Sequence, residues 1–542
     1  MRDVKRYFYN AILLSLSALI MRSVAVAFNV YVTEKVGAEG MGILTLVGSA
    51  YGFAVTFATS GVSLAVTRLV AETVVTAPTH EASHRLGNVA LVTAAYSAVF
   101  GGLAGAVLFF GADYIGASLL GDERTVESLR IFAVTLPSSA LASALSGYFH
   151  ACRRVSKNAA AQVSGQAIKI AVTVSALTLL SPPGLEPMLA VVSVGGAVAE
   201  VGSFVIAFCL YVADKRKNYP KKSDVVGQSP SKASTELCSD TKIDAAGSLL
   251  STALPLALSS YVRSGLVTLE HILIPRGLRK SGSSYSSAIA SYGVLHGMVM
   301  PVVLFPYAVL GSFTSLLVPE LSICRAKREN ERIRHIARLV FRSTLIFAIG
   351  TAVIMAAFSN ELGLALYDSE EAGEYILMLS PIIPVMYLDT AADSMLKGLG
   401  HQLFCMRVNI ADALISVVLV WLLVPMWGVK GYAVVIVVSE LINAALSIWK
   451  LVSVTGLRAE FAKWLIRPLA SATFASAAVK YVSVPSADGV GVTLAVVGAV
   501  ALYAAFLVAS GAVTVTDVGY IAGIFGKEKA KTGKKTRMAQ KA

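Results

Sequence analysis

Long apolar stretches alternate with short polar stretches along almost the whole chain. An α-helix needs about 20 apolar residues to cross the hydrocarbon core of a bilayer, and stretches near that length recur throughout the sequence. They are expected at residues 11–32, 42–66, 89–110, 129–151, 158–180, 188–212, 249–274, 289–318, 339–358, 375–396, 408–425, 432–454, 464–482 and 490–513. The pattern therefore predicts an all-α polytopic membrane protein with 14 transmembrane helices.

The second half of the chain repeats the first. Arg263 follows Arg22 at an offset of 263 − 22 = 241, and Glu270 follows Asn29 at the same offset. An offset of 401 − 150 = 251 relates a second set of matches: Leu145, Gly147, His150 and Asn158 with Leu396, Gly398, His401 and Asn409. The repeat predicts two six-helix bundles in parallel arrangement, followed by two C-terminal helices.

The domain boundaries expected from this repeat are 1–213 for the first bundle, 247–456 for the second and 457–513 for the two additional helices. Residues 214–246 are polar and lack a hydrophobic period, so they are expected to form a flexible cytoplasmic linker. Residues 514–542 are expected to form a basic cytoplasmic tail.

Composition and charge agree with a membrane protein. Only 15% of the residues are charged, whereas soluble domains carry about 25%. The net charge of +13 arises from Lys and Arg in loops on one predicted side of the membrane. This asymmetry predicts a multi-pass protein of the cell membrane with both termini in the cytoplasm, although the loop with Arg276, Arg279 and Lys280 breaks the rule. Cytoplasmic retention explains the basic loops, so no nucleic-acid partner is expected.

Recognisable catalytic motifs are absent from the sequence. It contains no nucleotide-binding loop, no nucleophile triad and no metal-spaced His cluster, and its five cysteines lack ligand spacing. We therefore expect no enzyme, no cofactor and no metal site.

Two arginines lie within predicted spans. A guanidinium at mid-membrane depth costs from about 3 to over 10 kcal/mol, so Arg22 and Arg263 are expected to face water or a partner. Two such spans suggest a central polar chamber between two bundles, where guanidiniums bind phosphate oxygens in bidentate fashion. The alternative is that Arg22 pairs with Glu200 or Glu270 and only locks helices together.

A polar stripe is expected on the fifth span. Gln162, Gln166 and Lys169 share one helical face, which suits sugar hydroxyls. Hydrogen bonds between helices are the alternative role.

Candidates for ion coupling lie in later spans. Glu270 stands beside His271, and such a pair can titrate near neutrality, unless Glu270 is simply a hydrogen-bonded carboxylate. Asp389 and Asp393 are four residues apart and form an acidic pair that would bind a cation or meet Arg263.

Several runs of the sequence resemble the stage V sporulation protein B group. They are SGVSLAVTRLVAE (60–72), GYFHACRRVSKNAAAQVSGQAIK (147–169), ASYGVLHGMVMPVVLFP (290–306), LKGLGHQ (396–402) and SEL (439–441). That group belongs to the multidrug/oligosaccharidyl-lipid/polysaccharide (MOP) flippase superfamily. The resemblance implies two bundles flanking a V-shaped central cavity, two additional C-terminal helices, and alternating access that moves a lipid-linked sugar headgroup without ATP hydrolysis.

The resemblance also suggests roles for single positions. Arg22 matches a cavity arginine of lipid II flippases and sporulation homologues, whereas Asn29 stands where a second arginine is common. Glu270 matches an acidic residue of the seventh span. The eighth span lacks the arginine of lipid II flippases, and its only titratable residue, His296, becomes a further candidate for ion coupling.

Three functions follow as hypotheses. The first is a monomeric flippase for a polyprenyl-diphosphate-linked oligosaccharide or peptidoglycan precursor, embedded among membrane lipids and driven by H⁺, Na⁺ or the membrane potential. The second is a drug/cation antiporter of the same fold with an acidic, aromatic-lined chamber. The third is a non-transporting membrane scaffold that recruits partners through loops such as 214–246.

Overall fold

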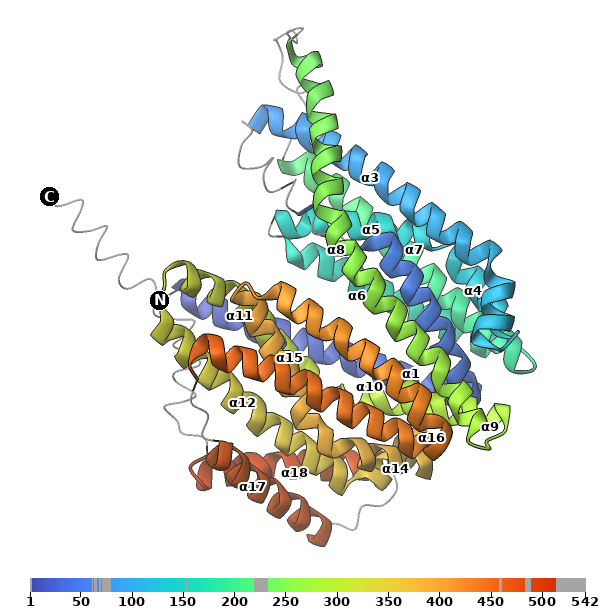
Figure 1. Cartoon of the computed structure of the whole chain (residues 1–542), viewed down its shortest axis with the longest axis vertical. Helices are drawn as coiled ribbons and strands as arrows, with labels where there is room; N and C mark the ends of the chain where they lie inside the picture. Colours follow the sequence, from blue (N-terminus) through green and yellow to red (C-terminus); the bar gives the residue numbers. More distant parts are fainter. Residues whose placement is uncertain are drawn as a thin grey trace, which may run out of the picture. The chain divides into compact units, whose positions relative to one another are not determined.

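The computed structural model describes residues 2–60, 62, 66, 67, 70, 79–152, 154–218, 233–457, 461–482 and 489–512 (Figure 1). Its described elements are all helices, as the hydrophobic pattern predicts. Nine helices in the described residues are long and apolar enough to cross a membrane, or ten when the bent pair α4 and α5 is counted as one span. The chain is therefore an all-α polytopic membrane protein.

The first half of the chain is built from long helices. They are α1 (Arg2–Thr59), α3 (Thr79–Phe110), the π-helix η1 (Tyr114–Leu120), α4 (Thr125–Ala133), α5 (Leu136–Ala151), α6 (Val155–Leu180) and α7 (Leu185–Asn218). The helices α4 and α5 meet at an angle of 48°.

The second half contains more interrupted helices. They are α8 (Ala233–Lys280), α9 (Tyr285–Tyr292), the π-helix η3 (Gly293–Val299), α10 (Met300–Val303), α11 (Tyr307–Ala326), α12 (Asn330–Ala357), α13 (Ser359–Tyr367), α14 (Glu370–Leu379), η4 (Ser380–Ile382), α15 (Ile383–Gly398) and α16 (Gln402–Thr455). The chain continues with α17 (Phe461–Val482) and α18 (Gly489–Ala509). Interruptions coincide with prolines: one lies in the first turn of α10, and another lies in the first turn of α15.

Two helices each contain two predicted spans. The backbone of α1 breaks at Gly37 (φ 69°), and that of α16 breaks at Gly428 (φ 59°). Both φ values lie in the left-handed region, which glycine enters without a Cβ clash. Each break therefore separates the paired spans that the hydrophobic pattern predicts.

The repeat is also visible in the positions of residues with positive φ. Gly37, Gly121 and Gly184 in the first half have counterparts at Gly282, Asp368 and Gly428 in the second. The offsets are 282 − 37 = 245, 368 − 121 = 247 and 428 − 184 = 244. Corresponding turns thus share a residue with positive φ in both halves.

Contacts group the described residues into two compact units. Unit 1 takes residues from Met1–Glu34, Val294–Ser416 and Trp427–Ala542, and unit 2 takes them from Lys35–Gly293 and Val417–Met426. The first predicted span thus groups with the second half of the chain, and the seventh groups with the first half. This grouping differs from the boundaries expected at 213 and 247, because packing does not follow the order of the repeat.

Unit 2 has a core shared by several of its helices. Leu129 and Leu136 are fully buried and pack in one cluster with Ile272 of α8. The helices α3 and α5 pack together, as do α6 and α7 (Figure 1). Burial of these apolar faces stabilises the packing of the helices, and the packed helices hold the polar residues of the unit in place.

In unit 1, the two C-terminal helices dock on α12. The hydroxyl of Tyr503 on α18 donates a hydrogen bond to the carbonyl of Ile346, 2.7 Å away. A Cβ at Gly350 would lie only 2.2 Å from the Tyr503 ring, so the close approach of these helices requires glycine there. The helices α17 and α18 also pack against each other (Figure 1).

An ion-pair cluster joins three turns of unit 2. Arg124 donates hydrogen bonds to Glu39 and Asp122, each 2.8 Å away, and Ser286 donates to the other Glu39 oxygen at 2.6 Å. The Ser286 hydrogen bond, followed by Arg124, lowers the pKa of the Glu39 carboxyl. The cluster keeps these turns together at one end of the unit.

The expected linker and tail are only partly described. In the structure α7 continues to Asn218 and α8 begins at Ala233, so helices include both edges of the expected 214–246 linker. Residues 219–232, and the expected tail at 514–542, lie outside the described residues.

Candidate functional site

The two intramembrane arginines are both exposed. Arg22 lies on α1 in unit 1, and Arg263 lies on α8 in unit 2. Among the described residues, neither guanidinium has a carboxylate within ion-pair distance. Arg22 lies in unit 1 and Glu200 and Glu270 lie in unit 2, so the ion pair considered as an alternative role for Arg22 stays a prediction.

The helix that carries Arg263 also carries Glu270 on the same face. Seven residues of α-helix make nearly two turns, so the two side chains project in similar directions about 10 Å apart along the axis. Glu270 is partly buried. The neighbouring His271 points elsewhere, because its Nδ1 lies 2.8 Å from the hydroxyl of Tyr292, which is fully buried.

Asn29 connects three elements of unit 1. Its Nδ2 donates a hydrogen bond to the Gly297 carbonyl at 2.9 Å, and its Oδ1 accepts one from Tyr367 at 3.0 Å. Tyr367 also donates to the Met298 carbonyl. Both carbonyls belong to the π-helix η3, and π-helical turns occur frequently at functional sites. The Asn29 amide thus fixes α1 to η3, and its cavity role stays a prediction.

His296 lies in the same π-helix. Its Nε2 is 2.8 Å from the hydroxyl of Tyr432, which is buried on α16. This contact ties η3 to the second part of α16. His296, which is predicted to take part in ion coupling, therefore already has the Tyr432 hydroxyl as a partner.

The three residues of the polar stripe on α6 differ in their exposure. Gln162 is exposed, whereas Gln166 and Lys169 are partly buried. Lys169 interacts electrostatically with Glu200 on α7. The structure thus brings Lys169 close to the carboxylate of Glu200, which lies in a different predicted span.

Hydrogen bonds extend from Glu200 through unit 2. Ser139 donates to Glu200 Oε2 at 3.0 Å. The hydroxyl of Tyr51 lies 2.9 Å from that of Thr135 and 3.3 Å from that of Ser139. We call Tyr51, Thr135, Ser139, Lys169 and Glu200 the Glu200 network. It contains one carboxylate and one ammonium group, so its formal charges balance.

A second group of polar residues lies in unit 1 on α15 and the two parts of α16. Asp389 is only 8% exposed, and its Oδ2 accepts a hydrogen bond from Asn443 at 3.1 Å. Its Oδ1 is buried and has no hydrogen-bond partner among the described residues.

Asp393 has several neighbours. Its Oδ2 accepts a hydrogen bond from Asn409 at 3.3 Å and lies 3.3 Å from the exposed Lys397 ammonium. Ser447 approaches the other oxygen at 3.5 Å. Asp389 and Asp393 therefore share one face of α15, as their spacing predicts.

Two further carboxylates complete this group. Asp412 accepts a hydrogen bond from Ser439. Asp412 and Glu440 both interact electrostatically with Asp389. We call Asp389, Asp393, Asp412 and Glu440 the acidic cluster. Lys397 forms an ion pair with Asp393 of this cluster. The described residues contain no arrangement of three or more His, Cys, Asp or Glu side chains suited to a metal ion.

Sequence reasoning did not include several of these residues in the site. Asp412 follows Asn409 by three residues, and Asn443 follows Glu440 by three, so each pair lies on one face of α16. Polar residues at this spacing in a very apolar helix are the signal that identifies them. Tyr51, Thr135 and Ser139 give no such signal, because hydroxyl groups are common in transmembrane helices.

Comparisons with known proteins give a consistent result. The family described as "Polysaccharide biosynthesis protein" matches residues 8–237, and the family MatE matches residues 282–422. Stage V sporulation protein B of Bacillus subtilis (strain 168) is 23% identical over 436 residues, which are 80% of this chain and 81% of the relative.

Solved structures share the fold. The lipid II flippase MurJ in an inward closed conformation has a TM-score of 0.67 at 12% identity, covering 91% of this chain and 98% of the other. An inward-facing multidrug resistance MATE family transporter has a TM-score of 0.63 at 13% identity, covering 82% and 98%. A transporter from Pyrococcus furiosus has a TM-score of 0.56 at 14% identity, covering 82% and 95%, and its description links a reversed polarity of the binding pocket to a different function.

Proposed function

We propose that the chain is a member of the MOP flippase superfamily and that it moves a lipid-linked oligosaccharide or peptidoglycan precursor from the inner to the outer leaflet by alternating access. An ion gradient or the membrane potential drives the movement. The matching family described as "Polysaccharide biosynthesis protein" and the structural similarity to a lipid II flippase support this substrate class.

The observation that carries the proposal is the exposure of Arg22 and Arg263 on apolar helices. A guanidinium at membrane depth is retained at high cost, and a diphosphate-linked headgroup supplies the acidic oxygens that it binds best. In the proposed mechanism each half contributes one arginine to the diphosphate, while Asn29, Glu270, Gln162, Gln166 and Lys169 contact the headgroup. The acidic cluster, with Glu270, His271 and His296 as further candidates, takes up the H⁺ or Na⁺ that drives the cycle.

A drug/cation antiporter is the second candidate. The acidic cluster favours it, because four neighbouring carboxylates would attract a cation. This candidate predicts that Asp389, Asp393 and Glu270 bind the transported molecule, and that the two arginines are dispensable.

The test is a flipping assay in proteoliposomes. A fluorescent polyprenyl-diphosphate-linked oligosaccharide is the probe, and a membrane-impermeant quencher measures its transfer between leaflets. We expect Arg22→Ala and Arg263→Ala each to lower the initial rate by at least about tenfold, which corresponds to about 1.4 kcal/mol. Lysine at either position should restore part of the rate, because it keeps the charge but loses the bidentate geometry.

The matched control is Arg407→Ala, which removes an exposed arginine from α16. It should flip the probe at the wild-type rate. Wild-type rates in both Arg22 and Arg263 variants would contradict the proposal. Uptake of an organic cation without any flipping of the probe would establish the antiporter instead.

A further inference from the structure

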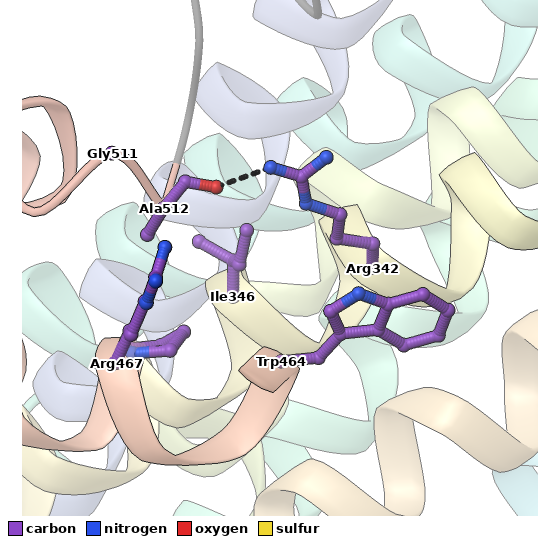
Figure 2. A pocket seen from close by; sticks show the side chains of 7 residues that line it. Arg342, Ile346, Trp464, Arg467, Gly511 and Ala512 are labelled. Carbon is purple, nitrogen blue, oxygen red and sulfur yellow. Dashed lines mark hydrogen bonds between the residues drawn. The ribbon is translucent and has the colours of Figure 1, made fainter. Parts of the chain in front are cut away.

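A cavity lined by two arginines contains none of the candidate-site residues. It has a volume of about 200 Å³ and is formed in unit 1 by α12, α17 and the end of α18 (Figure 2). Its lining residues are Arg342, Ile346, Trp464, Arg467, Pro468, Gly511 and Ala512. None of them is acidic. The cavity is much larger than one water molecule, whose share of liquid volume is about 30 Å³.

The two guanidinium groups converge on the end of α18. Arg342 donates a hydrogen bond from Nη2 to the Ala512 carbonyl at 2.6 Å, and Figure 2 shows Arg467 approaching Ala512 from α17. This hydrogen bond orients the Arg342 guanidinium. Arg467 has no carboxylate within ion-pair distance among the residues that the structure describes. Two like charges beside one cavity repel each other, and an anion bound there would relieve that repulsion.

The cavity lies at the ends of three predicted spans, where lipid headgroups are expected. It lies near the beginning of α17 and the end of α18, on the side that loop charge predicts to be cytoplasmic. Arg342 is twelve residues into α12, after a charged first part that contains Arg334 and Arg338. The buried Trp464 ring forms one wall, and Trp is enriched at membrane interfaces.

Apolar side chains beside the cavity would accommodate acyl chains. On α17, Ile466 is 62% exposed and Leu469 is 45% exposed, and they flank Arg467 in the sequence. A lipid phosphate in the cavity would therefore have its tails next to an apolar helix surface. A soluble anion would make no use of these residues.

We propose that this cavity binds the phosphate of an anionic membrane phospholipid. Guanidinium groups bind phosphate oxygens in bidentate fashion, and basic pockets between transmembrane helices on the cytoplasmic side hold anionic headgroups. The bound lipid connects α17 and α18 to α12 and stabilises their packing. It is a resident lipid and not the transported molecule, so this proposal is independent of the flippase function.

The test compares lipids on the purified full-length protein in detergent. Phosphatidylglycerol is added at increasing concentration, and the thermal unfolding midpoint is followed by intrinsic fluorescence. Binding to the folded state alone raises the midpoint with concentration. We expect phosphatidylglycerol to raise it, and we expect phosphatidylcholine and inorganic phosphate to leave it unchanged.

The decisive variant is Arg467→Gln. Arg467 has no hydrogen-bond partner among the described residues, so the substitution breaks no hydrogen bond with them. It should raise the phosphatidylglycerol concentration for a half-maximal shift at least about tenfold. The control Arg407→Gln, an exposed arginine on α16, should respond like the wild type. An unchanged response of Arg467→Gln, or an equal shift with phosphatidylcholine or inorganic phosphate, would overturn the proposal.

Discussion

Glu200 and Glu440 occupy matching positions in the two halves, at an offset of 440 − 200 = 240, but their surroundings differ. Glu200 in unit 2 accepts a hydrogen bond from Ser139 and lies near the cation Lys169. Glu440 in unit 1 has Asp389 and Asp412 nearby. One half of the duplicated scaffold therefore carries balanced charge, and the other carries surplus negative charge.

The sequence shows how this difference arose. At the offset of 251, Ser138, Ala142 and Ala161 of the first half stand where the second half has Asp389, Asp393 and Asp412. Conversely, Lys169 stands where the second half has Val420. Surplus negative charge within a membrane is costly unless protons or cations neutralise it. The comparison therefore identifies the second half as the stronger candidate for ion coupling.

The largest effect is expected from Asp389→Asn. This variant removes the most buried carboxylate of the acidic cluster with little change in shape. Gradient-driven flipping in proteoliposomes should fall at least about tenfold and should no longer depend on an imposed H⁺ or Na⁺ gradient.

The matched control is Ser138→Asn, which places the same amide at the equivalent position of the first half. It should keep its ion dependence. The proposed asymmetry would be wrong if both variants lost ion dependence equally.

An intermediate effect is expected from Lys169→Met. Without its nearby cation, the partly buried Glu200 becomes a poorly compensated charge, and the variant should lose about 2 kcal/mol of stability. The double variant Lys169→Met/Glu200→Gln should recover most of the loss. Thermal unfolding midpoints in detergent measure both changes.

The control for this pair is Lys397→Met in the other half. Lys397 is 47% exposed, so its ion pair with Asp393 should contribute less than about 1 kcal/mol. Equal losses for the two lysine variants, or no recovery in the double variant, would show that Lys169 does not balance Glu200.

The smallest effect is expected from two serines with similar roles. Ser139 and Ser439 are each 8% exposed, and they donate hydrogen bonds to Glu200 and Asp412. Ser139→Ala and Ser439→Ala should each cost about 1 kcal/mol of stability. Double-mutant cycles with Glu200→Gln and Asp412→Asn should give similar coupling energies, whereas coupling in one half alone would mean that the serines are not equivalent.

The candidate site was only partly predictable. The spacing of Asp389 and Asp393 predicts a shared helical face, and the structure shows that they do share one. Their partners Asn443 and Ser447 come from a helix about 50 residues later, and helical spacing carries no information about such a distant neighbour. The link between Lys169 and Glu200 was missed for the same reason.

The sequence by itself determined that the chain is an all-helical membrane protein and that its second half repeats its first. This was possible because transfer of a helix into a bilayer depends mainly on the residues of that helix. Only the tertiary structure decided that α1 breaks at Gly37, that the first span groups with the second half of the chain, and that charge is balanced in one half but not in the other. Those outcomes depend on which helix faces meet, and side chains from distant segments determine that together.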